Sequence, residues 1–268
     1  MAEWITLPAA PGRAAPGGAT EGRPTGAQAG EQADGSGVVS VPLRCWWAAP
    51  TSPGRGAILV LPEVFGINAW VRSVADRLAL EGYAALAVPL FARTAPALEL
   101  GYGADDLAEG RRHKDRTSSA ELLADLDGAC RWLQQRTGAG LLGCVGFCFG
   151  GHASLLAASL PQIAATADFY GAGVASGRPG GGPPTLDVLP EVTGRRWCFC
   201  GRRDPLMPAA EQAAIGAALR QADPEGARHR LIELEAGHGF MCEARPDHDP
   251  EAAAAGWQGM LELFATTL

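Results

Sequence analysis

The sequence has little lysine and no excess of positive charge. Lys114 is the only lysine among 268 residues, and 22 basic against 29 acidic side chains give a net charge of −7. Schiff-base enzymes and P-loop proteins need a lysine in an apolar pocket or a GxxxxGK[ST] motif, and Lys114 has neither. A chain with a pI near 5.3 also lacks the basic surface that nucleic-acid phosphates require. We therefore expect no nucleic-acid partner.

Long hydrophobic runs are absent as well. No segment approaches the roughly 20 apolar residues that cross a bilayer, and the start Met1-Ala2-Glu3-Trp4 does not resemble a secretory signal. We expect a cytoplasmic protein without a membrane partner. The seven cysteines are an odd number in a chain long enough to build a core without disulfides, so we expect reduced thiols.

The composition, 47% apolar and 19% charged, suits a single α/β domain over residues 1–268. Between Pro8 and Gly37, 12 of 30 residues are Gly or Pro and large apolar side chains are nearly missing. Such a segment buries too little surface to offset its ordering entropy, so we interpret 8–37 as a flexible insertion. Residues 178–184 form a shorter loop of the same kind.

The rest of the chain alternates between two patterns. Short apolar runs predict buried strands, and segments with helical spacing follow them, one after the helix-capping residue Asn68 and one between the capping box at Ser118 and the stop at Gly138. This alternation predicts an α/β fold with a mainly parallel sheet covered on both faces, whose site lies at the carboxyl ends of the strands. The expected strands are Ala57–Leu61, Tyr83–Val88, Leu141–Phe147, Ala164–Phe169, Arg196–Cys200 and Arg230–Leu234, and the other expected helices are His152–Leu160, Ala209–Ala222 and Glu251–Phe264.

The segment Gly146-Phe147-Cys148-Phe149-Gly150-Gly151 lies between an expected strand and an expected helix. It has the form of the G-x-S-x-G nucleophile elbow with cysteine in place of serine, in which small residues permit a strained turn that raises the side chain above the sheet. The following helix N-terminus favours thiolate, the reactive form of Cys148. The alternative is that Cys148 is a small buried side chain in a glycine-rich turn.

A nucleophile elbow requires an acid and then a histidine further along the chain. Asp204 follows one expected strand and His238 follows the last one, in a loop flanked by glycines. Each could be an ordinary loop residue, but their order after an elbow favours a triad. We expect the other histidines, which are His113, His152, His229 and His248, to be structural or solvated.

The loop after the first buried strand contains Glu63, Val64 and Phe65. In this fold, that loop contributes one backbone N–H to the oxyanion hole, and the residue after the nucleophile contributes the other. The expected donors are the N–H groups of Val64 and Phe149.

Several of these segments together resemble the dienelactone hydrolase (carboxymethylenebutenolidase) family over about Val38 to Leu268. They are Pro62–Asn68, Pro89–Arg93, Gly146–Gly151, Tyr170-Gly171, Asp204 and Gly237–Phe240. The resemblance implies a single-domain α/β-hydrolase fold whose cysteine opens the lactone ring of dienelactones.

The resemblance also assigns roles to individual residues. It implies Cys148 as nucleophile, His238 as base and Asp204 as the residue that orients the base. Glu63 would bond the resting thiol and take its proton when substrate binds. For the substrate, the resemblance implies that Arg93 holds a carboxylate and that Tyr170 lines the same pocket.

Two positions depart from the family pattern. The family's second carboxylate-binding arginine lies four residues after the histidine, where this chain has Cys242, and the small polar residue that often follows the histidine is Gly239 here. The catalytic residues therefore transfer, whereas the dienelactone substrate stays open.

We accordingly expect a cysteine hydrolase of a small lactone or activated ester, working without cofactor or metal. A carboxylesterase or thioesterase with an unrelated acyl substrate is the alternative. A third reading is a thiol redox or metal-binding protein built on Cys198-Phe199-Cys200 with Cys242, although C-x-C lacks the paired C-x-x-C spacing of zinc sites. An inactive binding module on this fold is also conceivable, but the complete acid–base set opposes it. The sequence leaves the oligomeric state open.

Overall fold

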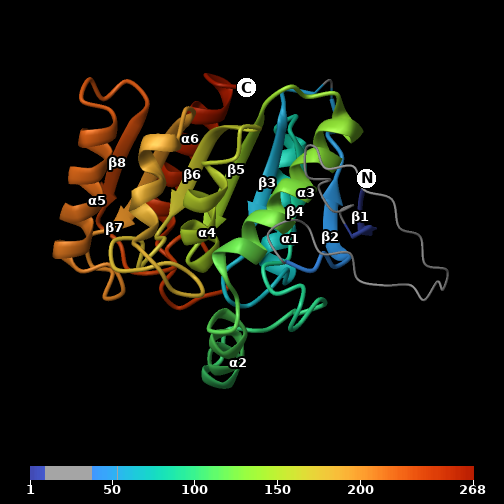
Figure 1. Cartoon of the computed structure of the whole chain (residues 1–268), viewed down its shortest axis with the longest axis horizontal. Helices are drawn as coiled ribbons and strands as arrows, with labels where there is room; N and C mark the ends of the chain where they lie inside the picture. Colours follow the sequence, from blue (N-terminus) through green and yellow to red (C-terminus); the bar gives the residue numbers. More distant parts are fainter. Residues whose placement is uncertain (10–37, 53) are drawn as a thin grey trace, which may run out of the picture.

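The computed structural model describes residues 1–9, 38–52 and 54–268, and its strands form one sheet of order β1-β2-β4-β3-β5-β6-β7-β8 (Figure 1). The pairs β1–β2 and β2–β4 are antiparallel and all the others are parallel. The strands are β1 (Ala2–Leu7), β2 (Leu43–Ala48), β3 (Ala57–Leu61), β4 (Ala84–Ala87), β5 (Leu142–Phe147), β6 (Ile163–Phe169), β7 (Arg195–Gly201) and β8 (His229–Leu234). The expected mainly parallel sheet is confirmed.

Helices cover both faces of this sheet. Alternate residues of β3 point to opposite sides: Ile58 and Val60 pack in one apolar cluster with α1 and α6, while Leu59 and Leu61 pack in another with α3 and α4. A strand buried on both faces explains why its sequence is continuously apolar. The helices are α1 (Ala69–Leu80), α2 (Ala104–Lys114), α3 (Ser119–Thr137), α4 (Phe149–Ala157), α5 (Ala209–Ala222) and α6 (Pro250–Ala265), with a 3₁₀ helix η1 (Thr185–Glu191).

The predicted caps at Asn68 and Ser118 and the predicted stop at Gly138 are confirmed. Asn68 accepts the N–H of Val71 at the start of α1, Ser118 and Glu121 form the capping box of α3, and Gly138 ends α3 in the left-handed conformation. Helix α4 begins at Phe149 rather than His152, directly after Cys148. The sequence analysis did not identify β1, β2, α2 or η1. The insertion predicted for 8–37 lies almost wholly outside the described residues.

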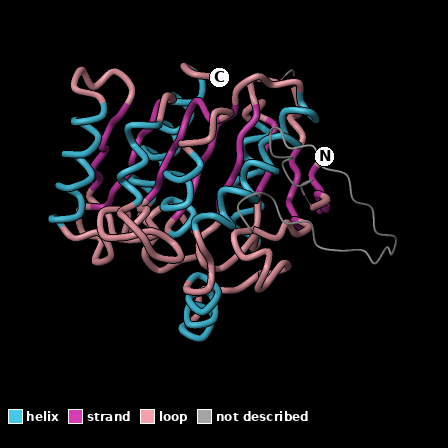
Figure 2. The backbone as a smooth tube through the Cα atoms, viewed as in Figure 1, coloured by secondary structure: helices cyan, strands magenta, loops and turns pink. Residues whose placement is uncertain are grey.

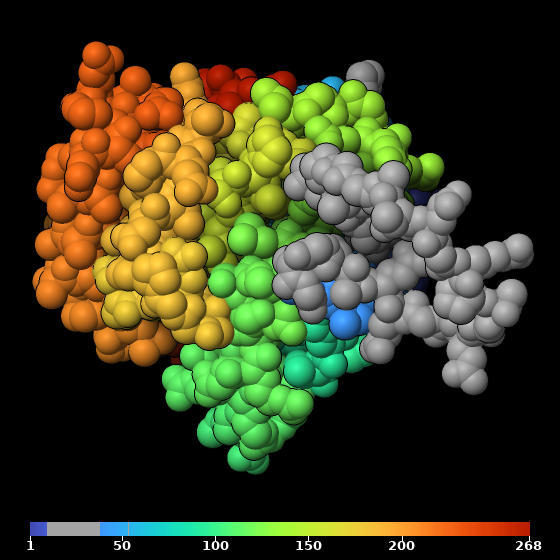
Figure 3. Space-filling model, in the orientation of Figure 1, coloured from blue at the N-terminus to red at the C-terminus, as the bar shows by residue number. Residues whose placement is uncertain are grey.

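The loops that follow the parallel strands gather at the end of the molecule where α2 projects, which Figure 1 labels and where Figure 2 shows the loops in pink. Only Gly110 of α2 is fully buried, and the helix stands out from the surface (Figure 3). In the described residues, no helix combines the length and hydropathy needed to span a bilayer. The expected location of the active site is therefore the end of the molecule that carries α2.

Candidate active site

Cys148 lies at a strained turn between β5 and α4. Its φ of 53° and ψ of −116° are unusual for a residue with a side chain, and its N–H donates to the carbonyl of Phe169 at 3.0 Å. The flanking glycines are required, because a Cβ on Gly146 would lie 1.9 Å from the Gly150 oxygen and one on Gly150 would lie 2.3 Å from the Leu61 oxygen. This geometry matches the predicted elbow, and Cys148 is the only one of the seven cysteines that is not fully buried.

Asp204 and His238 meet next to this turn. The Oδ2 atom of Asp204 and the Nδ1 atom of His238 are 2.7 Å apart, and Oδ1 accepts the N–H of Leu206 at 2.7 Å, which fixes the carboxylate. Nε2 of His238 is buried without a hydrogen-bond partner among the described residues. Burial lowers the pKa of His238, but Cys148 and Asp204 raise it more, to about 10. The arrangement therefore favours the protonated imidazole of His238.

Tyr170 lies behind the histidine. It has a φ of 46°, is fully buried, and its ring packs edge-on against His238 with centroids 5.0 Å apart. Burial raises the pKa of its hydroxyl, and Glu63 and the nearby thiols add to this effect. Tyr170 is not among the residues that line the cleft, but its ring packs against His238, which does line it, so the expectation that Tyr170 lines the substrate pocket stays a prediction.

The Glu63 carboxylate is 1% exposed and approaches the site from the loop after β3. Its Oε1 atom accepts a hydrogen bond from Nη1 of Arg245 at 2.9 Å, whereas Oε2 is buried without a partner among the described residues. Burial raises the pKa of Glu63, and Arg245 and His238 oppose that shift. Such a carboxylate has a free oxygen and an increased affinity for a proton.

A cleft of about 520 Å³ opens above these residues. Cys148, His238 and Arg245 line it, together with both expected oxyanion donors, Val64 and Phe149. Phe149 is the first residue of α4, so its N–H is one of the donors that a helix leaves unpaired at its N-terminus. The apolar side chains of Val64, Phe65, Phe149 and Leu206 also line the cleft.

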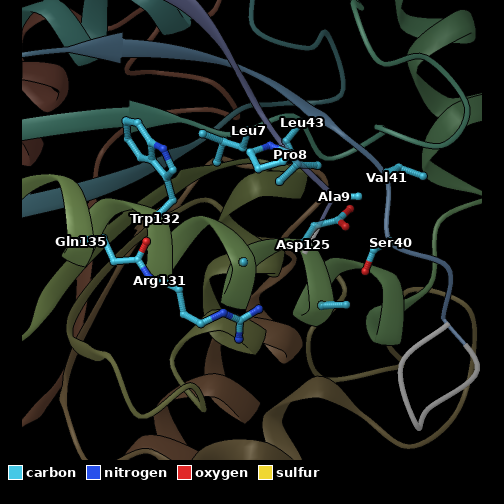
Figure 4. A pocket seen from close by; sticks show the side chains of 12 residues that line it. Leu7, Pro8, Ala9, Ser40, Val41, Leu43, Asp125, Arg131, Trp132 and Gln135 are labelled. Carbon is cyan, nitrogen blue, oxygen red and sulfur yellow. The ribbon is translucent and has the colours of Figure 1, made fainter. Parts of the chain in front are cut away.

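Arg93 does not reach the cleft. Its Nη2 atom donates to Oδ1 of Asp125 at 3.0 Å and to the Val39 carbonyl at 2.9 Å, and its Nε lies 3.6 Å from a Glu121 carboxylate oxygen. Asp125 also lines a separate pocket beside β1, β2 and α3 (Figure 4). None of the predicted catalytic residues is among the residues that line this pocket. The expectation that Arg93 binds a substrate carboxylate is corrected, because carboxylates of the protein itself already hold its guanidinium.

Arg245 is the site residue that the sequence analysis missed. It follows His238 by seven residues, pairs with Glu63 and lines the cleft. Gly239, with a φ of 83°, makes this possible, since a Cβ there would lie 2.6 Å from Cζ of Arg245. The two departures from the family pattern are therefore connected: Cys242 replaces one arginine, and Gly239 leaves space for another. The signal available in the sequence was an arginine seven residues after the histidine.

The remaining cysteines have structural surroundings. Cys198 and Cys200 are buried with their sulfurs 3.7 Å apart, and the Cys198 thiol donates to Asp168 at 3.4 Å. Cys242 is also buried, and burial raises its pKa to about 11. In the described part of the chain, no three His, Cys, Asp or Glu side chains are arranged to hold a metal ion. Burial keeps the thiols of Cys198, Cys200 and Cys242 from the solvent.

Comparison with known proteins gives a consistent family. Residues 43–268 match the model of the dienelactone hydrolase family. A protein of Synechocystis that is named as a carboxymethylenebutenolidase is 38% identical over 225 residues, which are 82% of this chain and 90% of that protein. A Bradyrhizobium protein, named as a 2-oxo-3-(5-oxofuran-2-ylidene)propanoate lactonase, is 30% identical, covering 80% of this chain and 85% of that one.

A solved structure agrees. The crystal structure described as a dienelactone hydrolase from Klebsiella pneumoniae superposes with a TM-score of 0.73 at 28% identity, covering 84% of this chain and 93% of that one. The predicted fold class and enzyme class are confirmed. The chain belongs to the dienelactone hydrolase family and is a hydrolase of ester or lactone bonds with the α/β-hydrolase fold.

Proposed function

We propose that the chain opens a lactone or activated ester through an acyl-enzyme intermediate on Cys148. The observation that carries the proposal is the elbow geometry of Cys148, the one partly exposed thiol, next to the His238–Asp204 pair at the floor of a cleft. A thiolate at such a position attacks a carbonyl carbon and forms a thioester.

The reaction has two steps, formation of a thioester on Cys148 and hydrolysis of that thioester. The Cys148 sulfur bonds to the carbonyl carbon while the carbonyl π electrons move to oxygen, which the N–H groups of Phe149 and Val64 stabilise. The carbon–oxygen bond to the leaving group then breaks, and the alkoxide takes the proton of the His238 imidazolium. Water next attacks the thioester, His238 accepts a proton from that water, and the thiolate leaves.

Glu63 and Arg245 would regulate the thiol. In the structure, Arg245 pairs with Oε1 of Glu63. A substrate carboxylate in the cleft competes for the same guanidinium, and release from Arg245 removes an interaction that lowers the pKa of Glu63. The carboxyl then becomes a stronger proton acceptor for the Cys148 thiol, so thiolate would form when substrate is present. A thiol at rest resists oxidation better than a thiolate.

A carboxylesterase or thioesterase on the same scaffold is the second candidate, and the position of Arg93 favours it. With that guanidinium paired to Asp125, one expected carboxylate anchor is missing from the cleft. A site with fewer anchors selects less strongly for charged lactones.

Mass spectrometry of the protein with a panel of lactones, aryl esters and thioesters tests the proposal. We expect a covalent adduct of acyl mass on the tryptic peptide that contains Cys148, and no adduct in Cys148→Ala. Turnover by the wild type with no Cys148 adduct under rapid quenching, together with turnover by Cys148→Ala, would contradict the acyl-enzyme. The preferred member of the panel separates a lactonase from a general esterase or thioesterase.

A further inference from the structure

Helix α2 presents one charged stripe to the cleft. Leu107, Arg111 and Lys114 all line the cleft and are spaced i, i+4 and i+7, so they follow one face of the helix. Arg112 points elsewhere: it is 67% exposed, pairs with Glu109 and is not part of the cleft wall. The helix thus separates two kinds of cation, one facing the cleft and one facing solvent.

The position of α2 over the cleft is built into the packing. A Cβ at Gly110 would lie 2.3 Å from the carbonyl oxygen of Val64 and 3.0 Å from its carbonyl carbon, so the helix backbone rests directly on the loop of the expected oxyanion donor. Only glycine permits this approach. The stripe is consequently held at a set place above the reacting centre although the rest of α2 is exposed.

The cations of the stripe are available to a ligand. Arg111 forms no ion pair with an acidic side chain in the described residues, and Lys114 pairs only with its exposed neighbour Asp115. Glu211 is the only acidic side chain among the described residues that line the cleft, and its Oε1 atom already accepts the N–H of Gly173 at 2.5 Å. Among the described residues, Arg111 is therefore a cation of the cleft wall without an acidic partner, and Lys114 has only an exposed one.

The cleft also continues beyond the reacting centre. A second hollow of about 470 Å³ shares Lys114, Phe149, Ala172, Gly173 and Ser176 with it, so Lys114 stands where the two meet. Apolar side chains line the cleft together with Cys148, whereas Lys114 also lines the second hollow, whose lining lacks Cys148 and His238. This distribution suits a substrate with an apolar body at Cys148 and an anionic end further out.

We infer that Arg111 and Lys114 form an outer anion subsite that selects esters or lactones bearing a carboxylate remote from the bond that is cleaved. The inference rests on the proposed function, since it supposes cleavage at Cys148. Arg245 pairs with Glu63. The outer subsite would therefore bind the substrate at a second position, different from the one that Arg245 contacts. Basic residues at the end of α2 also complement the helix dipole, and that simpler role applies equally to Arg112.

The test compares 4-nitrophenyl hydrogen adipate and 4-nitrophenyl hydrogen suberate with their methyl esters. We expect Arg111→Gln and Lys114→Gln each to lower kcat/KM for the acids about two- to fivefold at low ionic strength, and the double variant about tenfold, as partly exposed ion pairs do. The methyl esters should be unaffected, and about 0.5 M salt should remove most of the difference. Arg112→Gln is the matched control and should change neither substrate.

Two outcomes would overturn the subsite. One is an equal loss for acid and methyl ester in the double variant, and the other is a loss in Arg112→Gln that equals the loss in Arg111→Gln. Cys148→Ala, assayed with the methyl esters, separates this failure from that of the proposed function. If Cys148→Ala is inactive while the acid-to-ester ratio of the double variant stays at the wild-type value, only the outer subsite is refuted.

Discussion

The residues that would perform the chemistry and those that would recognise the substrate are held in different ways. Cys148, Asp204 and His238 follow the ends of parallel strands; backbone hydrogen bonds hold Cys148 and Asp204, and the Asp204 carboxylate holds the His238 ring. The candidate recognition residues Arg245, Arg111 and Lys114 have long side chains that extend from loops or from the exposed helix α2. The positions of the catalytic residues depend on the sheet. The positions of the recognition side chains depend on which carboxylates lie within their reach.

The two arginines Arg93 and Arg245 make the same contrast within one residue type. Arg93 occupies the position that the family pattern favours, yet Asp125 and Glu121 retain it. Arg245 occupies a position outside the pattern, yet it reaches Glu63 and the cleft. The position of a residue in the sequence therefore predicts where a short catalytic side chain lies. It predicts less well where the guanidinium of a long arginine side chain lies.

The largest effect should come from Cys148. We expect Cys148→Ala to reduce kcat at least about 10³-fold with little change in melting temperature, because loss of a triad nucleophile is rarely compensated. Cys148→Ser should keep weak activity, since a hydroxyl requires a stronger base. Iodoacetamide should label only Cys148 in the folded protein, because the other six cysteines are buried. Retention of more than a hundredth of wild-type turnover in Cys148→Ala would refute the assignment.

The titration of His238 tests the same group of residues. Its pKa of about 10 lies above the ordinary value of 6.5, so the imidazolium stabilises the fold below pH 6.5 and this contribution is lost as the pH rises toward 10. In Cys148→Ala the largest interaction that raises the pKa is absent. We expect NMR of the ring to give a clearly lower pKa in that variant. Equal pKa values in both proteins would show that Cys148 does not raise the pKa of His238.

Glu63 joins the two groups, because it is buried near the triad and paired with Arg245. We expect Glu63→Gln to lower turnover about tenfold or more, as the loss of a proton acceptor does, while the melting temperature changes little. Alkylation rates of Cys148, with and without a substrate analogue, supply the second readout. Unchanged alkylation together with unchanged turnover would exclude a role for Glu63 in thiol activation.

Substitution of Arg93 and of Arg245 separates a structural role from a role in substrate recognition. Arg93→Gln leaves the buried Asp125 carboxylate without its partner, so we expect a loss of roughly 1–3 kcal/mol in stability and an unchanged preference between a carboxylate-bearing lactone and its methyl ester. Arg245→Gln should shift that preference toward the ester. The two variants are compared by denaturant unfolding and by the ratio of kcat/KM values. A shift in preference with Arg93→Gln alone would restore the role that the family pattern assigns to it.

The smallest expected effect concerns Gly239. Both Gly239 and Gly226 have positive φ, but an added Cβ meets Arg245 only at Gly239 and meets nothing within 4 Å at Gly226. Each change to alanine should cost about 1 kcal/mol in stability from the backbone conformation. Only Gly239→Ala should also lower turnover of the carboxylate-bearing lactone, because Arg245 must move. Equal kinetics in the two variants would mean that Gly239 does not position Arg245.

The sequence by itself determined the parts of the molecule that local chemistry specifies. Apolar runs located the parallel strands, the caps at Asn68 and Ser118 located two helix starts, and the spacing Gly146-x-Cys148-x-Gly150 located the elbow. These features depend on residues that are neighbours in the chain. The strands β1 and β2 and the helix α2 were not found, because α2 has only one fully buried residue, β1 is mostly part-exposed or exposed, and β2 mixes buried with part-exposed positions.

Only the tertiary structure decided how distant charges pair. Arg93 and Asp125 are 32 residues apart, and Glu63 and Arg245 are 182 apart. A long guanidinium can reach several partners of similar energy, so its final position depends on which carboxylates the folded chain brings near it and on small features such as the space beside Gly239. The residues that could act on an ester were therefore visible in the sequence. The residues of the cleft wall that would select the substrate became apparent only from the folded structure.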